Sequence, residues 1–263
     1  MVACRLHNGI WRCMLAWLWL VGLLPLSVCG QTDNEVCGYR FTTGVDSNVW
    51  EDLSLHLSYV NPQFDYFEFF IGEDRVQGLS LSPQGVIYVN NQYATLDTAV
   101  RPFDSVGFLS RAPLLAPVGC RSDVNVTACR SGLKNEEGDS VYVIELELRI
   151  GAGDTSSYRL VQVQLRSSDN SITFVYGELW DTLSVYMQLG MAITPTEYIV
   201  INQMNHSAAA SDTNALQGRG WPGGWRYYRF EPACAIPKGI QVKTLTTTSA
   251  RVSWLGDGQY WFA

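Results

Sequence analysis

The chain has 263 residues and a formal net charge of −7, from 18 basic and 25 acidic side chains. Nucleic-acid binding depends on clustered Lys and Arg, so this acidic balance argues against a DNA- or RNA-binding protein. The acids are scattered rather than run together, which is typical of a solvated surface.

The first 30 residues have the pattern of a secretory signal peptide. Arg5 and Arg12 form a basic region, and an uncharged apolar run over 14–28 follows. Small residues at 28–30 suit a signal peptidase, and the run is too short to predict a membrane span. We therefore expect an exported protein, secreted or at the cell surface, that begins at Gln31. A lipoprotein signal acylated at Cys29 is the alternative.

Four cysteines remain after residue 30, and an oxidising compartment favours their pairing as disulfides: Cys37, Cys120, Cys129 and Cys234. Cys120 and Cys129 bracket a short polar loop, so we expect these two to pair, which would stabilise the fold by about 2–3 kcal/mol. Cys37 would then pair with Cys234 if the two ends of the domain meet. The cysteines lack Cys-x-x-Cys spacing and few histidines accompany them, so we expect no zinc or other metal site and no cofactor.

The middle of the chain reads as a β-meander. In the stretch 141–150, Ile144 and Leu146 fall on one face while Glu145 and Glu147 fall on the other, the period of two that a half-buried strand requires. The stretch 158–166 repeats this alternation, with Val161, Val163 and Leu165 inward and Gln162 and Gln164 outward. A third strand over 172–176 ends at Gly177.

Further short strands are predicted on both sides of this meander, over 50–60, 64–71, 85–89, 185–193 and 197–202. Turn residues separate them, including Pro83 and Gly85. Many short, aromatic-rich strands predict an all-β fold, an antiparallel β-sandwich that forms one domain over 31–233.

After a boundary near Cys234 the pattern changes. Ala250, Val252 and Trp254 alternate with polar residues in the run LTTTSARVSW, and a Pro-led strand precedes it. This run resembles the start of a fibronectin type III domain, which needs roughly 100 residues and seven strands. Residues 234–263 are therefore expected to be a truncated fibronectin type III domain, and residues 31–233 the complete domain before it.

The sandwich region resembles the nidogen-like extracellular domain of animal matrix and surface proteins. The matching runs are FFIG at 69–72, LSLSPQGVIYV at 79–89, VQVQLRSSDNSITFVYGELW at 161–180 and QLGMAI at 188–193. The run at 115–118 departs from the family, because it lacks the Phe and Trp of an APFW-like segment. The resemblance implies a modular protein of adhesion or matrix contacts without catalytic residues. Fibronectin modules also occur in bacterial exported enzymes, so the source class stays open.

Four aromatic residues near the end of the sandwich region are the candidate ligand-binding group: Trp221, Trp225, Tyr227 and Tyr228. Exposed Trp and Tyr rings offer large amphipathic faces on which sugar rings could stack. The alternative is that the aromatics of a closing strand fill the core.

The acidic residues form no convincing catalytic or calcium-binding group. Glu145 and Glu147 have a spacing that superficially resembles the carboxylate pair of glycosidases, but an exposed strand face explains both. The loop acids Glu136, Glu137 and Asp139, with Asp154, could supply hard oxygen ligands to calcium, but they lack the spacing of a calcium loop. A Gly-x-Ser-x-Gly motif is absent, and we expect no catalytic residues.

Two glycosylation sequons, at Asn125 and Asn205, fall in polar, loop-like stretches, and in a eukaryotic secretory pathway either could carry a glycan. Together these features predict a noncatalytic extracellular matrix or cell-surface module for adhesion or scaffolding, with a matrix protein or a glycan as its partner. The alternative is the N-terminal accessory region of a secreted hydrolase whose catalytic domain lies downstream of residue 263.

Overall fold

The computed structural model divides the chain into two compact units, Met1–Thr32 and Asp33–Ala263. It describes residues 35–53, 67–90, 103, 109–120, 124–136, 139–150, 157–178, 186–203, 205–210, 218–219, 221–233, 238–245, 250–256 and 259–262. The predicted signal peptide lies outside the described residues, as does most of the strand predicted over 50–60.

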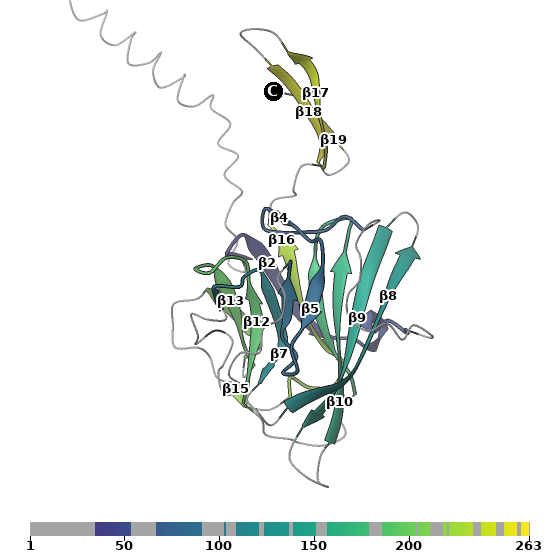
Figure 1. The fold of residues 1–263 in the computed structure, drawn as a ribbon, viewed down its shortest axis with the longest axis vertical. Helices are drawn as coiled ribbons and strands as arrows, with labels where there is room; N and C mark the ends of the chain where they lie inside the picture. Colours follow the sequence, from purple (N-terminus) through teal and green to yellow (C-terminus); the bar gives the residue numbers. More distant parts are fainter. Residues whose placement is uncertain are drawn as a thin grey trace, which may run out of the picture. The chain divides into compact units, whose positions relative to one another are not determined.

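The first of two large sheets, sheet 1, is antiparallel throughout and holds the predicted meander at its centre (Figure 1). In spatial order its strands are β1 (Glu35–Val36), β2 (Tyr39–Val45), β16 (Arg226–Pro232), β11 (Ile172–Tyr176), β10 (Ser157–Arg166), β9 (Asp139–Ile150) and β8 (Val124–Glu136). The predicted alternation along β9 and β10 is confirmed, because Leu146, Leu148 and Val163 are fully buried in the core.

The second large sheet, sheet 2, lies opposite sheet 1 (Figure 1). Its strands, in spatial order, are β14 (Ser207–Ala210), β13 (Tyr198–Asn202), β12 (Tyr186–Ala192), β7 (Leu114–Cys120), β6 (Ile87–Val89) and β5 (Leu79–Leu81), and β15 (Gly218–Arg219) also pairs with β12. The strands predicted over 85–89, 185–193 and 197–202 are therefore present, with slightly shorter bounds.

One apolar core joins the two sheets. Phe174 and Phe230 of sheet 1 belong to the same buried cluster as Leu115, Leu189 and Met191 of sheet 2. The predicted all-β, antiparallel β-sandwich is thus confirmed. The described residues contain almost no helix: a short 3-10 turn, η1 (Ser47–Val49), and the helical residue Leu109.

A second buried cluster lies on the outer face of sheet 2. Phe103 and Leu109, from the connection between β6 and β7, pack with Tyr88, Leu114 and Val200. Sheet 2 is therefore covered on both faces, whereas the outer face of sheet 1 carries polar residues and the segment 46–53.

The N- and C-terminal strands of the sandwich lie side by side. Strand β2 pairs with β16 from Val45 opposite Arg226 to Tyr39 opposite Pro232. Beyond the last pair, the Ala233 N–H donates to the Gly38 carbonyl at 2.8 Å. The chain thus leaves the sandwich next to the point where it entered.

Two smaller sheets complete the described residues. The hairpin β3 (Phe70–Ile71) and β4 (Asp74–Arg75) occupies part of the strand predicted over 64–71. Strands β17 (Lys238–Leu245), β18 (Ala250–Gly256) and β19 (Gln259–Phe262) form a separate antiparallel sheet. Strands β17 and β18 match the two strands predicted after the boundary, and their membership of the fibronectin type III family stays a prediction.

Strand β8 is the main element that the sequence did not predict. Its first half lies in the stretch between Cys120 and Cys129 that was expected to be a polar loop. The strand carries a bulge between Val126 and Ala128. A bulge shifts the residues after it to the opposite faces, so a strict period-two pattern is lost. Pairing with β9 supplies the hydrogen bonds that hold this polar stretch as a strand.

Candidate functional site

The structure separates the four predicted aromatic residues into two groups. Tyr228 lies opposite Phe174 of β11 and is fully buried in the core, whereas Tyr227 lies opposite Val175 and Gly44 on the outer face. Adjacent residues of a strand point to opposite faces, so Tyr227 and Tyr228 cannot contribute to one surface. The expectation of a single four-residue cluster is therefore wrong.

Trp221 and Tyr228 belong to the core group. Trp221 packs edge-on against Tyr176, with ring centroids 5.2 Å apart, and the Tyr228 hydroxyl lies 2.8 Å from Nδ1 of His206. Burial raises the pKa of Tyr228, while burial and the nearby Arg226 lower the pKa of His206. For these two aromatics the core-filling alternative is the correct one.

Trp225 and Tyr227 lie on the outer side of sheet 1 and form a group with Trp50. The rings of Trp50 and Trp225 meet edge to face, with centroids 5.9 Å apart and an interplanar angle of 82°. The backbone N–H of Asp46 donates to the Trp225 carbonyl at 2.9 Å, which holds the start of β16 against the segment that carries Trp50. We call Trp50, Trp225 and Tyr227 the outer aromatic patch.

Two glycines form the floor of the outer aromatic patch. A Cβ on Gly44 would come within 2.7 Å of the Tyr227 ring, and a Cβ on Gly177 would lie 3.6 Å from Trp50 and 3.2 Å from Leu160. The rings therefore lie close against the sheet because these positions have no side chain. Leu160 and Tyr158, which are 37% and 56% exposed, extend the apolar surface along β10. Trp50 was not among the predicted residues, since only the fold brings it near Trp225.

The segment 46–53 that carries Trp50 is held to sheet 1 by two buried glutamines. The amide of Gln162 accepts from the Glu51 N–H at 3.0 Å and donates to the Glu51 carbonyl at 2.6 Å. The amide of Gln164 donates to the Val49 carbonyl at 2.7 Å, and Lys134 pairs with the Glu51 carboxylate at 2.5 Å. Buried amides need such partners, so these contacts position Trp50 firmly.

Glu145 and Glu147 do not form an exposed pair of acids. Glu145 is only 6% exposed, and it accepts from Gln162 at 3.0 Å and from Arg130 at 3.3 Å. Glu147 accepts instead from the Thr127 hydroxyl at 2.9 Å. The prediction of an exposed strand face is therefore wrong for Glu145, and each carboxylate is engaged in a separate structural contact.

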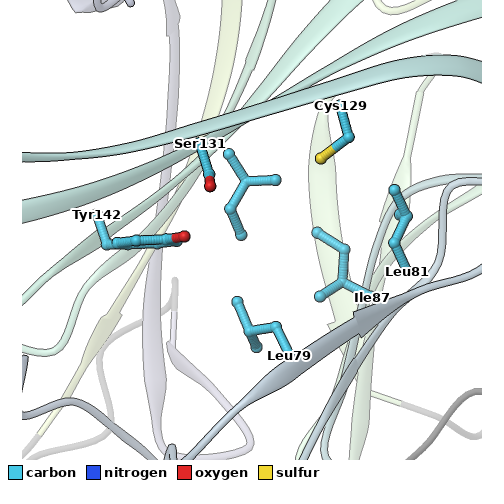
Figure 2. Close-up of a pocket in the computed structure, with 7 residues that line it drawn as sticks. Leu79, Leu81, Ile87, Cys129, Ser131 and Tyr142 are labelled. Atoms are coloured by element: carbon cyan, nitrogen blue, oxygen red, sulfur yellow. The ribbon is translucent and has the colours of Figure 1, made fainter. Parts of the chain in front are cut away.

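A small apolar pocket opens between the two sheets at the side of β8 and β5 (Figure 2). Its cavity volume is about 10 Å³, and its lining side chains come from both sheets: Leu79, Leu81, Ile87, Cys129, Ser131, Tyr142 and Ile144. The Ser131 hydroxyl hydrogen-bonds the Tyr142 side chain, but burial outweighs that bond and raises the pKa of Tyr142. Burial, helped by the charge of Glu145, raises the pKa of Cys129 to about 11, so its thiol stays neutral at physiological pH.

The predicted disulfides are not formed in this structure. Cys120 ends β7 in sheet 2, whereas Cys129 lies in β8 of sheet 1 with a free thiol that lines the pocket. Cys37 is also free, and its thiol lies 3.7 Å from the Tyr198 carbonyl. Cys234 lies outside the described residues, although Ala233 just before it bonds to Gly38 just after Cys37. The meeting of the two ends, which the Cys37–Cys234 pairing required, is thus present.

Both sequon asparagines are exposed. Asn125 lies on β8 rather than in the predicted loop, and Asn205 lies in the connection between β13 and β14. The Ser207 hydroxyl donates to Oδ1 of Asn205 at 2.8 Å. Glycosylation at either position stays a prediction.

Asp139, one of the loop acids considered for calcium, has protein partners instead. Burial works against ionisation of its carboxylate, but hydrogen bonds from Arg166 and Ser168 outweigh that effect and lower its pKa. Within the described ranges no group of three or more His, Cys, Asp or Glu side chains is placed to hold a metal ion. Glu137 and Asp154 lie outside those ranges.

No family model, no curated protein and no solved structure matches this chain. The resemblances to the nidogen-like and fibronectin type III families therefore remain predictions from the sequence. In the part of the chain that the structure describes, no helix has the length and apolar character to cross a membrane. The chain is an all-β protein built on a two-sheet sandwich.

Proposed function

We propose that this chain is a noncatalytic extracellular module, secreted or held at the cell surface, that serves adhesion or scaffolding by binding a glycan through the outer aromatic patch. The observation that carries the proposal is the placement of Trp50, Trp225 and Tyr227 together on the outer face of sheet 1. Rigid aromatic rings on a flat strand surface offer sugar rings a large contact area at low entropic cost.

The position of the chain ends supports a modular role. Strand β2, near the start of the sandwich, pairs in sheet 1 with β16, the last strand of the sandwich, before the chain continues to β17. Domains with neighbouring ends can be inserted into a longer chain without disturbing their cores. The predicted signal peptide and the exposed sequon residues Asn125 and Asn205 support an extracellular location.

The test is a binding screen with the secreted, full-length chain. We would expose it to an array of glycans and to a panel of matrix proteins, and then repeat the screen with Trp225→Ala and Tyr227→Ala. Loss of a Trp or Tyr at the centre of a contact costs about 2 kcal/mol, or about thirtyfold in affinity. Asp74→Ala, at an exposed position of β4, is the control and should bind normally.

The outcomes separate the proposal from its rivals. Glycan binding that the patch variants lose, with unchanged circular dichroism, supports it. Binding to a matrix protein alone, binding that survives Trp225→Ala, or no binding across both panels would contradict it.

A further inference from the structure

Strand β10 carries two exposed apolar side chains on the outer face of sheet 1. Tyr158 is 56% exposed and Leu160 is 37% exposed, whereas Gln162 and Gln164, which point outward further along the strand, are buried. Hydrogen bonds to the segment 46–53 account for the burial of the two glutamines. Neighbouring apolar side chains at a surface, unlike single ones, indicate a contact that covers them.

Asn125 shares the outer face with Tyr158, in one row across three strands. Asn125 of β8 lies opposite Arg149 of β9, and Arg149 lies opposite Tyr158 of β10. Leu148, next to Arg149, is fully buried in the core, so by alternation the three members of the row point outward. Neighbouring strands lie about 4.8 Å apart, which sets the Cα atoms of Asn125 and Tyr158 about 10 Å from each other.

Asn125 is the acceptor residue of a glycosylation sequon that is exposed at both of its polar positions. Asn125 and Thr127 are each exposed. The Thr127 hydroxyl donates to the Glu147 carboxylate at 2.9 Å, and Glu147 lies opposite Leu160. The sequon therefore belongs to the same two rows of the outer face as the exposed side chains Tyr158 and Leu160.

We propose that Asn125 carries an N-linked glycan whose first sugars lie across β9 and pack on Tyr158 and Leu160. Glycosylation joins Nδ2 of Asn125 to C1 of the first N-acetylglucosamine of a lipid-linked oligosaccharide diphosphate. The bond from C1 to the diphosphate oxygen breaks, the lipid diphosphate leaves with the electron pair, and Nδ2 loses one proton.

The glycan fits this surface in length and in chemistry. The first two sugars of an N-linked glycan span about two strand spacings, which is the separation of Asn125 from Tyr158. A pyranose ring presents C–H groups on its faces, and a tyrosine ring offers them a flat amphipathic surface. The contact also removes apolar area of Tyr158 and Leu160 from water, which is favourable in itself.

The second sequon provides a comparison within the same chain. Asn205 lies in the connection between β13 and β14, and its Oδ1 accepts from the Ser207 hydroxyl at 2.8 Å. The exposed large apolar side chains of the described residues lie on β2, β8 and β10 rather than on β13 or β14. A glycan at Asn205 therefore serves as a control for the glycan at Asn125.

This inference goes beyond the proposed function, from which it takes only the secretory route. Leu160 borders the outer aromatic patch, because a Cβ on Gly177 would lie 3.2 Å from Leu160 and 3.6 Å from Trp50. The chain's own glycan would thus cover the β10 side of the outer face, beside the patch. This packing does not depend on whether the patch binds a glycan of another molecule.

The first experiment uses the full-length chain secreted from a eukaryotic host. Mass spectrometry of its peptides should find a glycan at Asn125. The folded chain is then nitrated with tetranitromethane before and after an amidase removes its glycans. Nitration of Tyr158 should be at least about fivefold faster after removal, because packed sugars shield the ring, while nitration of Tyr227 should not change. The Asn205→Gln variant should show the same difference at Tyr158.

A double-mutant cycle tests the contact by urea unfolding. In the glycosylated chain Tyr158→Ala should raise the unfolding equilibrium constant about fivefold, and in Asn125→Gln it should change it less than about twofold. Val45→Ala, at a 61% exposed position of β2, is the control and should have the same effect in both backgrounds. Asn125→Gln is preferred to Thr127→Ala because it keeps the hydrogen bond from Thr127 to Glu147. If Asn125→Gln is not secreted, the chain deglycosylated after folding takes its place.

Three results would overturn the proposal. The first is a secreted chain without a glycan at Asn125, and the second is a nitration rate of Tyr158 that glycan removal does not change. The third is an equal effect of Tyr158→Ala with and without the glycan. The Trp225→Ala variant separates this proposal from the proposed function, since it should lose binding at the patch and still protect Tyr158.

Discussion

The two sheets of the sandwich protect their outer faces in different ways. On sheet 2, Leu114 and Val200 point outward and are buried under Phe103 and Leu109 in an apolar cluster. On sheet 1 the outward residues Gln162 and Glu145 are also buried, but hydrogen bonds to the segment 46–53 and to Arg130 cover them. One face is covered by dispersion and hydrophobic burial, and the other by a polar network whose parts must all be satisfied.

This difference determines where change is tolerated. Substitutions that remove or add atoms in a buried apolar face lower the unfolding free energy, because protein interiors are close-packed. A covered polar face responds to the loss of a hydrogen-bond partner, and its exposed margin tolerates most substitutions.

The largest effect is expected at Gly190 in β12 of sheet 2. A Cβ there would lie 1.9 Å from the Ile199 carbonyl oxygen of β13, so alanine could fit only if the two strands separated. Gly190→Ala should cost at least about 4 kcal/mol of unfolding free energy or prevent secretion of the chain. Gly78→Ala is the control, because a Cβ on Gly78 meets no atom within 4 Å. Equal urea midpoints for the two variants would contradict the close approach.

Substitution of Leu114 tests how much the apolar cluster on the outer face of sheet 2 stabilises the protein. The Leu114 side chain is fully buried between β7 and the segment that holds Phe103, so Leu114→Ala should destabilise the protein by about 3 kcal/mol. Leu160→Ala, at a 37% exposed leucine on the outer face of sheet 1, should cost less than about 1 kcal/mol. Urea unfolding of both variants decides this, and a similar loss at the two positions would show that the outer faces are not differently covered.

Substitution of Glu145 tests how much the hydrogen-bond network on the outer face of sheet 1 stabilises the protein. Glu145→Gln removes the charge that Arg130 binds, and it should cost about 1–2 kcal/mol. Glu147→Gln, one pleat along the same strand, keeps an acceptor for the Thr127 hydroxyl and should cost less. The ratio of the two losses in urea unfolding is the measurement. If Glu147→Gln proves the more harmful, the network around Gln162 is not what holds this face.

The smallest expected effect is a pH dependence of the unfolding free energy that comes from Asp139, the first residue of β9 in sheet 1. The pKa of this carboxyl lies below its ordinary value of 3.8 in the folded chain, so its contacts stabilise the protein above about pH 4 and are lost as the pH falls through the lowered pKa. Because the pair with Arg166 is partly exposed, Asp139→Asn should cost within about 1 kcal/mol at pH 7 and almost nothing at pH 2. The measurement is urea unfolding at both pH values. If Asp139→Asn lowers the unfolding free energy at pH 2 as much as at pH 7, the ionised carboxylate is not the source of the stabilisation.

The sequence predicted strands in both sheets: β9, β10 and β11 of sheet 1, and β6, β12 and β13 of sheet 2. Strands β9, β10 and β11 were predicted nearly to the residue, because one face is apolar and the other polar along each of them. In sheet 2, strand β7 was not predicted, since Leu114, Leu115, Ala116 and Val118 are all buried and a continuous apolar run has no period.

The candidate site shows the same limit. Trp225 and Tyr227 were named from their composition alone, and the fold keeps them on one surface. Trp50 was missed because 175 residues of chain separate it from Trp225, and no local signal reports that contact. Trp221 and Tyr228 were included because aromatic side chains look alike in sequence whether they fill a core or cover a face.

What the sequence determined by itself was the fold class and the faces of the central strands, since local alternation of polar and apolar residues encodes both. The tertiary structure alone decided that β8 is a strand, that Cys129 faces a pocket, and that Gln162 and Glu145 are buried. Each of these depends on which distant segment lies alongside. Such pairings are selected by the summed burial and hydrogen bonding of the whole sandwich, which no short stretch of sequence contains.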